Sequence, residues 1–208
     1  ISWGETPFRH LLIGASTAVL WLILDFLALV LVFGSGVVAF GWRSDMVWGV
    51  WLFNFVYLLT LNSLGEEIES RGYLQTVFSR ATGMRRGIMI SAVLFGASHI
   101  PINIYIYRSS LMTTLYHVVG AAIFGVVAGY LFVITGNILA SISLHSVWNV
   151  TQTSLPLQIN IPTDAPFVMY AQAALANAVI LFIILALLTL LHRHKPNWLG
   201  KKRENRCR

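Results

Sequence analysis

Apolar residues along this chain gather in blocks long enough to cross a lipid bilayer. An α-helix rises about 1.5 Å per residue, so about 20 apolar residues span a hydrocarbon core of about 30 Å. The blocks predict six transmembrane helices, at about residues 11–33, 46–64, 87–107, 114–135, 138–153 and 169–191. We therefore expect an all-α, polytopic membrane helix bundle.

One amphipathic stretch lies between the second and third of these blocks. If residues 72–81 are helical, one face carries mainly apolar side chains: Tyr73, Leu74, Val77, Phe78 and Ala81. Such a face favours a helix that lies along the membrane interface. We expect this interfacial helix on the cytoplasmic side.

Composition supports the membrane assignment. Of the 208 residues, 57% are hydrophobic and 11% are charged, whereas a soluble domain has about 45–50% apolar and about 25% charged residues. The net charge of +6 does not indicate a nucleic-acid partner, because most of it lies after the last apolar block. Basic residues there set topology and bind anionic lipid. We expect the lipid bilayer, and no nucleic acid, as a partner.

The positions of lysine and arginine predict the orientation. With six spans, both termini share one side, which receives eleven basic residues against two on the other. Since cytoplasmic segments are enriched in such residues, residues 1–191 are predicted to form one transmembrane domain with cytoplasmic termini, and residues 192–208 a basic cytoplasmic tail. The short chain and compact loops favour a prokaryotic plasma membrane. The eleven basic residues on the predicted cytoplasmic side are Arg9, Arg80, Arg85, Arg86, Arg193, Lys195, Lys201, Lys202, Arg203, Arg206 and Arg208.

The two ends of the chain carry smaller signals. The chain begins with Ile1 instead of methionine, so we expect a fragment or a processed form. The single cysteine, Cys207, excludes an intramolecular disulfide and a thiolate metal cluster.

Three segments place ionisable or amide side chains in or next to the membrane, where they are costly and therefore indicate function. In the first, Glu66 and Glu67 follow an apolar run without a turn signal, and Arg71 comes four residues after Glu67. That spacing predicts a Glu67–Arg71 ion pair on one helical face. Glu66 lies about 100° away around the helix and can point into the bundle. A solvated helix end is the alternative interpretation.

The other two segments carry histidines. His99 follows Phe95 by four residues, and Asn149 follows His145 by four, so each pair shares a helical face. The helical rise places His99, His145 and Glu66 at similar depths in the cytoplasmic half of the bundle, where they can line one cavity. Hydrogen bonding between helices is the alternative for each histidine.

Neighbouring positions refine this interpretation. The small residues at 96–98 permit close approach of another helix. His117 lies near the extracytoplasmic start of the fourth block, and Asp25 lies alone in the first. We expect both to be structural.

Taken together, the three segments resemble the CPBP family of intramembrane proteases, which includes the CAAX-processing Rce1 enzymes and the bacterial Abi proteins. The family pattern is EExxxR, then FxxxH, then HxxxN or HxxxD, all on membrane helices. Within about residues 46–153, this chain carries every position of the pattern, as Glu66, Glu67, Arg71, Phe95, His99, His145 and Asn149.

The resemblance implies hydrolysis of a peptide bond in a membrane-associated protein or peptide, through a site that opens to the cytoplasm. CAAX-type and bacteriocin or leader-type substrates both fit. Glu66 would be the general base that activates water, assisted by His99, while His145 and Asn149 would stabilise the oxyanion. Supporting positions would be Glu67, Arg71 and Phe95.

The residues leave metal dependence open. Glu66, His99 and His145 can together make a catalytic zinc site with one open position for water, and the family has been described as metalloproteases. The same side chains can hold a water without any metal, as in a glutamate-type endopeptidase. The expected cofactor is therefore none, or a divalent metal such as zinc.

Two other functions compete with the protease. One is a non-catalytic membrane scaffold or accessory subunit on the same fold. The other is a haem or ion-handling bundle built on His99, His145 or His117. The second leaves Glu66, Glu67, Arg71 and Asn149 without roles.

Overall fold

The computed structural model describes residues 7–40, 47–154, 157–159 and 167–192. The predictions about Ile1, Cys207 and the tail after His192 concern residues outside these ranges. The described chain is almost entirely helical, which confirms the all-α prediction.

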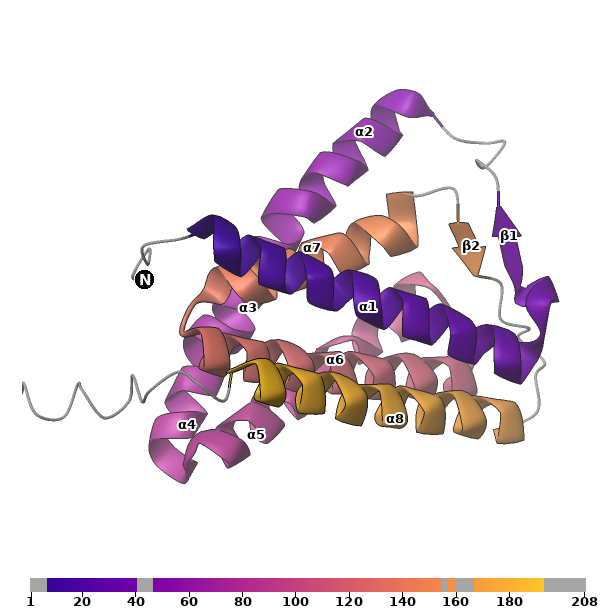
Figure 1. Cartoon of the computed structure of the whole chain (residues 1–208). Coiled ribbons are helices and arrows are strands. Elements are labelled where there is room, and N and C mark those ends of the chain that lie inside the picture. Colours follow the sequence, from indigo (N-terminus) through magenta and orange to yellow (C-terminus); the bar gives the residue numbers. More distant parts are fainter. Residues whose placement is uncertain (1–6, 41–46, 155–156, 160–166, 193–208) are drawn as a thin grey trace, which may run out of the picture.

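Within the described residues, four helical segments are long and apolar enough to cross a membrane: Pro7–Phe33, Met84–Ile106, Leu111–Thr135 and Phe167–Leu190. They correspond to helices α1 (Pro7–Phe33), α5 (Met84–Ser98) with the π-helical η4 (Ile102–Ile106), α6 (Leu111–Thr135) and α8 (Phe167–His192). In Figure 1, α1, α6 and α8 run beside one another, and α5 packs on α6.

The other two predicted spans are helical, but the count of six is not confirmed. Helix α7 (Ile138–Ser154) has 17 residues and packs along α1. The second predicted span lies in one unbroken helical run made of α2 (Trp48–Tyr57), η2 (Leu58–Asn62), α3 (Ser63–Glu67), η3 (Ile68–Gln75) and α4 (Thr76–Thr82). Residues 72–81 belong to this run, so their predicted helix continues directly from the glutamate segment.

Short elements complete the described chain. A 3-10 turn, η1 (Ser35–Val37), leads into strand β1 (Val38–Phe40), which pairs antiparallel with β2 (Leu157–Ile159), with Ala39 opposite Gln158. At the other end of the bundle, Gly83 separates α4 from α5 with φ of 92°, a value that suits a residue without Cβ.

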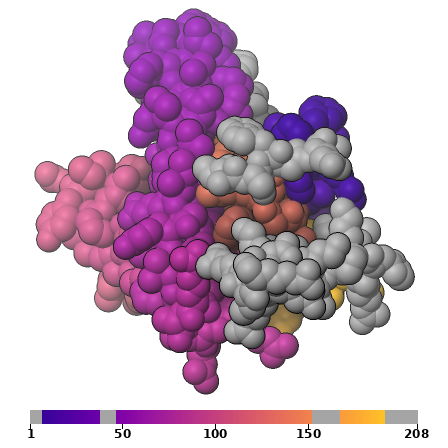
Figure 2. Space-filling view, turned by 90° about the vertical axis from the view of Figure 1, so that its left-hand side faces the viewer, coloured from indigo at the N-terminus to yellow at the C-terminus, as the bar shows by residue number. Residues whose placement is uncertain are grey.

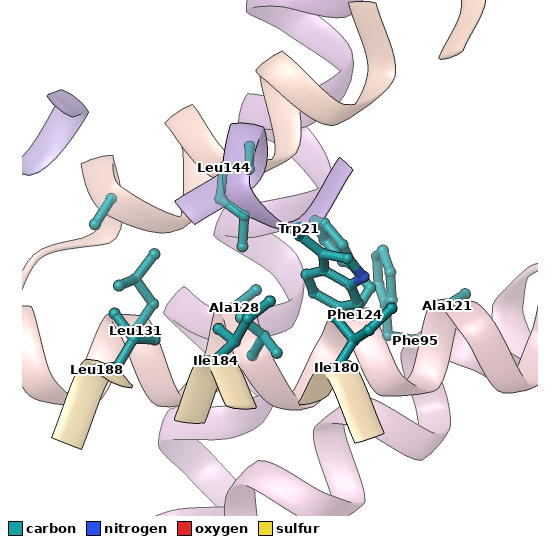
Figure 3. Packing of buried hydrophobic residues seen from close by; sticks show 13 residues of the cluster. Trp21, Phe95, Ala121, Phe124, Ala128, Leu131, Leu144, Ile180, Ile184 and Leu188 are labelled. Carbon is teal, nitrogen blue, oxygen red and sulfur yellow. The ribbon is translucent and has the colours of Figure 1, made fainter. Parts of the chain in front are cut away.

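The apolar core lies where α1, α6, α7 and α8 meet (Figure 3). Trp21 of α1 stacks on Phe124 of α6 with ring centroids 5.7 Å apart. Leu144 of α7 and Ile184 of α8 are buried in the same cluster. Phe95 of α5 joins it through Phe124, at 6.2 Å between centroids, and so links the core to the segment that carries His99.

Glycines let α5 and α6 approach closely. A Cβ on Gly96 would lie 2.6 Å from the carbonyl oxygen of Val118, and one on Gly125 would lie 2.9 Å from Cα of Ala92. This agrees with the close approach predicted from the small residues at 96–98. The contact holds the end of α5 firmly against α6.

Helix α2 stands apart from this core. None of its residues is buried, and Figure 2 shows it standing clear of the remaining helices. The charged part of the run, which follows α2, packs instead against α5 and α7. The core and this packing together place the glutamates between two histidine-bearing helices.

Candidate active site

The two adjacent glutamates lie at the end of α3, between two π-helical stretches. A π-helix replaces the usual i→i+4 hydrogen bond with i→i+5, and such stretches occur often at functional sites. The Glu66 side chain is 37% exposed and that of Glu67 is 0% exposed. One carboxylate therefore faces an opening, while its neighbour faces the interior.

Glu67 pairs with Arg71, as the spacing predicted. Nη1 of Arg71 donates to Oε1 of Glu67 at 2.9 Å, and both side chains are fully buried. Arg71 also donates to the carbonyl oxygen of Gly125 at 3.3 Å, and its guanidinium carbon lies 4.6 Å from the ring centroid of Phe95. Phe95 thus acts as a support for the buried cation.

His145 of α7 lies between the two carboxylates. Its Nδ1 is 2.8 Å from Oε1 of Glu67, and its Nε2 is 3.6 Å from Oε2 of Glu66. A carboxylate only accepts hydrogen bonds, so Nδ1 carries the hydrogen and donates it to Glu67. The ring packs against Phe95 and Phe124, with centroids 5.8 Å and 5.0 Å away. These contacts fix Nε2 as the nitrogen that faces Glu66.

His99 ends α5 and faces the same opening as Glu66. Its Nδ1 donates to the carbonyl oxygen of Phe95 at 2.8 Å, so Nε2 is left to accept a proton. Both His99 and Glu66 line a cleft of about 410 Å³. The complete lining is Glu66, Glu69, Ser70, Leu74, Leu94, Phe95, Ser98, His99 and Ile102.

Asn149 lies one helical turn beyond His145. Its amide Nδ2 donates to the hydroxyl of Ser63 at 3.4 Å, and Ser63 precedes Glu66 by three residues on α3. Neither His145 nor Asn149 is part of the cleft lining. The structure therefore brings Glu66 and His99 together along the cleft, with His145 behind Glu66.

Two residues that the sequence analysis did not connect with this site lie beside His99. The rings of His99 and His117 are 5.3 Å apart between centroids. Buried Asn103 links them, because its amide donates to the backbone carbonyl of His99 at 2.8 Å and lies 2.9 Å from Nδ1 of His117. The only available signal was the polar character of Asn103 in an apolar segment.

Asp25 finds its partner on another helix. It is 7% exposed, and the side chain of Asn177 on α8 hydrogen-bonds to it. Asn177 also donates to the hydroxyl of Tyr116 on α6 at 3.4 Å. These contacts connect α1, α6 and α8, and the structural role of Asp25 stays a prediction.

The arrangement of the described acidic and histidine side chains does not suit a bound metal ion. Among the described residues, no three His, Cys, Asp or Glu side chains gather in an arrangement that could hold a metal ion. As placed, Glu66, His99 and His145 do not form the three-ligand zinc site considered from the sequence.

The three segments lie within the range that matches a known protein family. A family model described as "Type II CAAX prenyl endopeptidase Rce1-like" matches residues 47–151, which is half of the chain. The matched range runs from α2 to α7 and contains all seven residues of the three segments. Neither the curated proteins nor the solved structures gave a match.

Proposed function

Because the chain belongs to the Rce1-like family of type II CAAX prenyl endopeptidases, we propose that it hydrolyses a peptide bond in a membrane-associated protein or peptide, with Glu66 as the base that activates water. The observation that carries this proposal is the shared cleft of Glu66 and His99, with His145 held 3.6 Å behind Glu66. CAAX-type and leader-type chains are the proposed substrate classes.

Glu66 and His99 act on the attacking water. Glu66 removes a proton from water in the cleft, and the resulting hydroxide oxygen bonds to the carbonyl carbon of the substrate. His99 orients that water through Nε2, since its Nδ1–H is already donated to Phe95. When the C–N bond breaks, protonated Glu66 gives its proton to the leaving nitrogen. The products are one carboxylic acid and one amine, as general acid–base catalysis requires.

His145 and Asn149 stabilise the negative oxygen of the tetrahedral intermediate. His145 does so in its imidazolium form, in which Nε2 also carries a hydrogen. Asn149 contributes its amide hydrogens. Donors fixed in position before reaction are worth about 3–4 kcal/mol each in oxyanion holes. Glu67 and Arg71 hold His145 in place from behind.

The proposed setting is a prokaryotic plasma membrane with the cleft open to the cytoplasm. It follows from the basic residues on the predicted cytoplasmic side. A membrane-anchored chain would then reach Glu66 from that side.

Cleavage of membrane-tethered peptides by the purified protein tests the proposal. Glu66→Gln keeps the side-chain shape and removes the base, so we expect the rate to fall by about 10²–10⁴-fold, the range for general base catalysis. His145→Ala should also abolish turnover, and a chelator should leave the wild-type rate unchanged. A wild type as inert as its correctly folded variants would contradict hydrolysis and favour a membrane scaffold.

A further inference from the structure

Glu69 is a second carboxylate on the cleft that holds Glu66, and none of the three family segments assigns it a role. Glu69 follows Glu66 by three residues on the same helical run. It is exposed at the surface and lines the cleft. Side chains three apart on a helix lie on neighbouring positions of one face, about 5–6 Å apart at Cβ. Glu66 and Glu69 therefore present two negative charges to one opening.

Glu69 differs from Glu67 in its partners. Glu67 is neutralised by Arg71 and bonded to His145. In the described part of the chain, no lysine, arginine or histidine lies within ion-pair distance of Glu69. Among the described residues its charge therefore has no counter-ion, and exposed charge is rare and costly near lipid.

The other walls of the cleft are mostly apolar. Leu74 comes from η3, Leu94 from α5 and Ile102 from η4. Besides His99, the charged or titratable side chains in the lining are the two carboxylates. Such a cleft suits a segment with apolar side chains and one positive charge, and disfavours a segment with acidic side chains.

The spacing of Glu66 and Glu69 on the helical run limits where that positive charge can be. An extended peptide advances about 3.3–3.6 Å per residue, so a Cβ separation of about 5–6 Å corresponds to one or two residues of substrate. A lysine or arginine within two or three residues of the bond attacked at Glu66 can therefore reach Glu69.

From this arrangement we propose that Glu69 selects substrates with a basic side chain close to the scissile bond. The inference rests on the proposed hydrolysis, since it takes Glu66 as the point of attack. Glu69 acts on substrate binding and contributes nothing to activation of water.

Acylated reporter peptides with an apolar host sequence provide the test. Each peptide carries a single lysine, alanine or glutamate at one test position. The test position is moved residue by residue around the cleaved bond, and the rest of the sequence is unchanged. The lysine peptide should be preferred over the alanine peptide by up to about fivefold in kcat/KM, the upper end for an exposed ion pair. Glu69→Gln should abolish this preference, Glu69→Asp should keep it, and Glu69→Lys should transfer it to the glutamate peptide.

Arg80→Gln is the matched control, because it also removes one charge, from an exposed residue outside the cleft lining. It should leave the ratio between the lysine and alanine peptides unchanged. An equal shift with Arg80→Gln, or a preference that survives Glu69→Gln, would overturn the inference.

Binding separates this inference from the proposed hydrolysis. In a Glu66→Gln background, fluorescence anisotropy measures affinity without cleavage. Tighter binding of the lysine peptide that disappears with Glu69→Gln supports the inference even if no peptide is cut. Equal affinity for the lysine, alanine and glutamate peptides overturns it, whatever the cleavage result.

Discussion

Nδ1 of His145 lies 2.8 Å from Oε1 of Glu67, across an interface that joins residues 78 positions apart in the sequence. The same carboxylate oxygen accepts from Arg71 at 2.9 Å. A buried cation therefore holds a carboxylate, and the carboxylate holds the imidazole ring in one orientation, with Nε2 turned to Glu66. Glu67 therefore fixes the position of the His145 ring beside Glu66.

Glu67→Gln should destabilise the protein strongly. The change leaves Arg71 charged and fully buried without its counter-ion, and breaking a buried ion pair costs about 3–5 kcal/mol. Thermal unfolding in detergent, followed by loss of helical signal, measures the effect.

The double variant Glu67→Gln with Arg71→Met is the control for this explanation. Methionine removes the unpaired charge and can still pack on Phe95, so we expect stability to recover in part relative to Glu67→Gln alone. A loss of stability in the double variant equal to the sum of the losses in Glu67→Gln and in Arg71→Met would show that the pair is not coupled. Cleavage should stay low in both, because His145 loses its charged partner.

Asn149→Ala should lower kcat by about 10²–10³-fold with little change in KM, the effect of removing one oxyanion donor. Steady-state kinetics on a cleaved reporter peptide gives both constants. Ser63→Ala is the matched control, because it removes the group that Asn149 contacts at 3.4 Å but no oxyanion donor. A loss of kcat in Ser63→Ala as large as in Asn149→Ala would contradict the oxyanion role.

Asn103→Leu should lower kcat by about 10–100-fold in a protein that still folds. Its buried amide holds the backbone of His99, and a displacement of about 1 Å at a catalytic group can cost 10²-fold. Asn177→Leu removes another buried amide, one that contacts Asp25 and Tyr116 instead. That variant should unfold at lower temperature yet retain its kcat. Similar kcat values for the two variants would count against positioning by Asn103.

Gly96→Ala should destabilise the contact between α5 and α6 by about 1–3 kcal/mol, the usual penalty for overpacking. The added methyl would meet the backbone oxygen of Val118, which cannot move without its helix. Gly120→Ala on α6 is the comparison, since a Cβ there meets nothing within 4 Å. It should be neutral or stabilise the helix by about 0.5–1 kcal/mol. Equal melting temperatures for the two variants would refute the packing argument.

Hydrophobic block length predicted the helices well where apolar residues were continuous. The boundaries of α1, α6 and α8 lie within a few residues of those expected. The count of spans could not be settled in this way, because α7 is short and the run from α2 to α4 carries charges. Periodicity assumes the α-helical repeat, so it also could not reveal the π-helical stretches on both sides of α3.

The candidate site was predictable only where its contacts are local. The Glu67–Arg71 pair followed from a spacing of four on one helix. Two other contacts depend on how separate helices pack, which the spacing of residues along the sequence does not encode. One is the hydrogen bond from His145 to Glu67. The other is the link from His99 to His117 through Asn103. His117 was expected to be structural, and its position 5.3 Å from His99 could not be read from its own helix.

The π-helical stretch η3 has a consequence for how this segment can change during evolution. It begins just after Glu67, which is fixed to α7, and ends at Gln75, whose amide donates to the carbonyl oxygen of Gly129 on α6 at 3.0 Å. A π-helical turn bonds i→i+5 where an α-helical turn bonds i→i+4, so it holds one extra residue. Deleting one residue between Glu67 and Gln75 can therefore restore a regular helix and leave both attachments in place. A second deletion would turn everything beyond by about 100°, and one attachment would then be lost. Residues 67–75 should therefore tolerate the loss of one residue, and family members should differ there in length by no more than one.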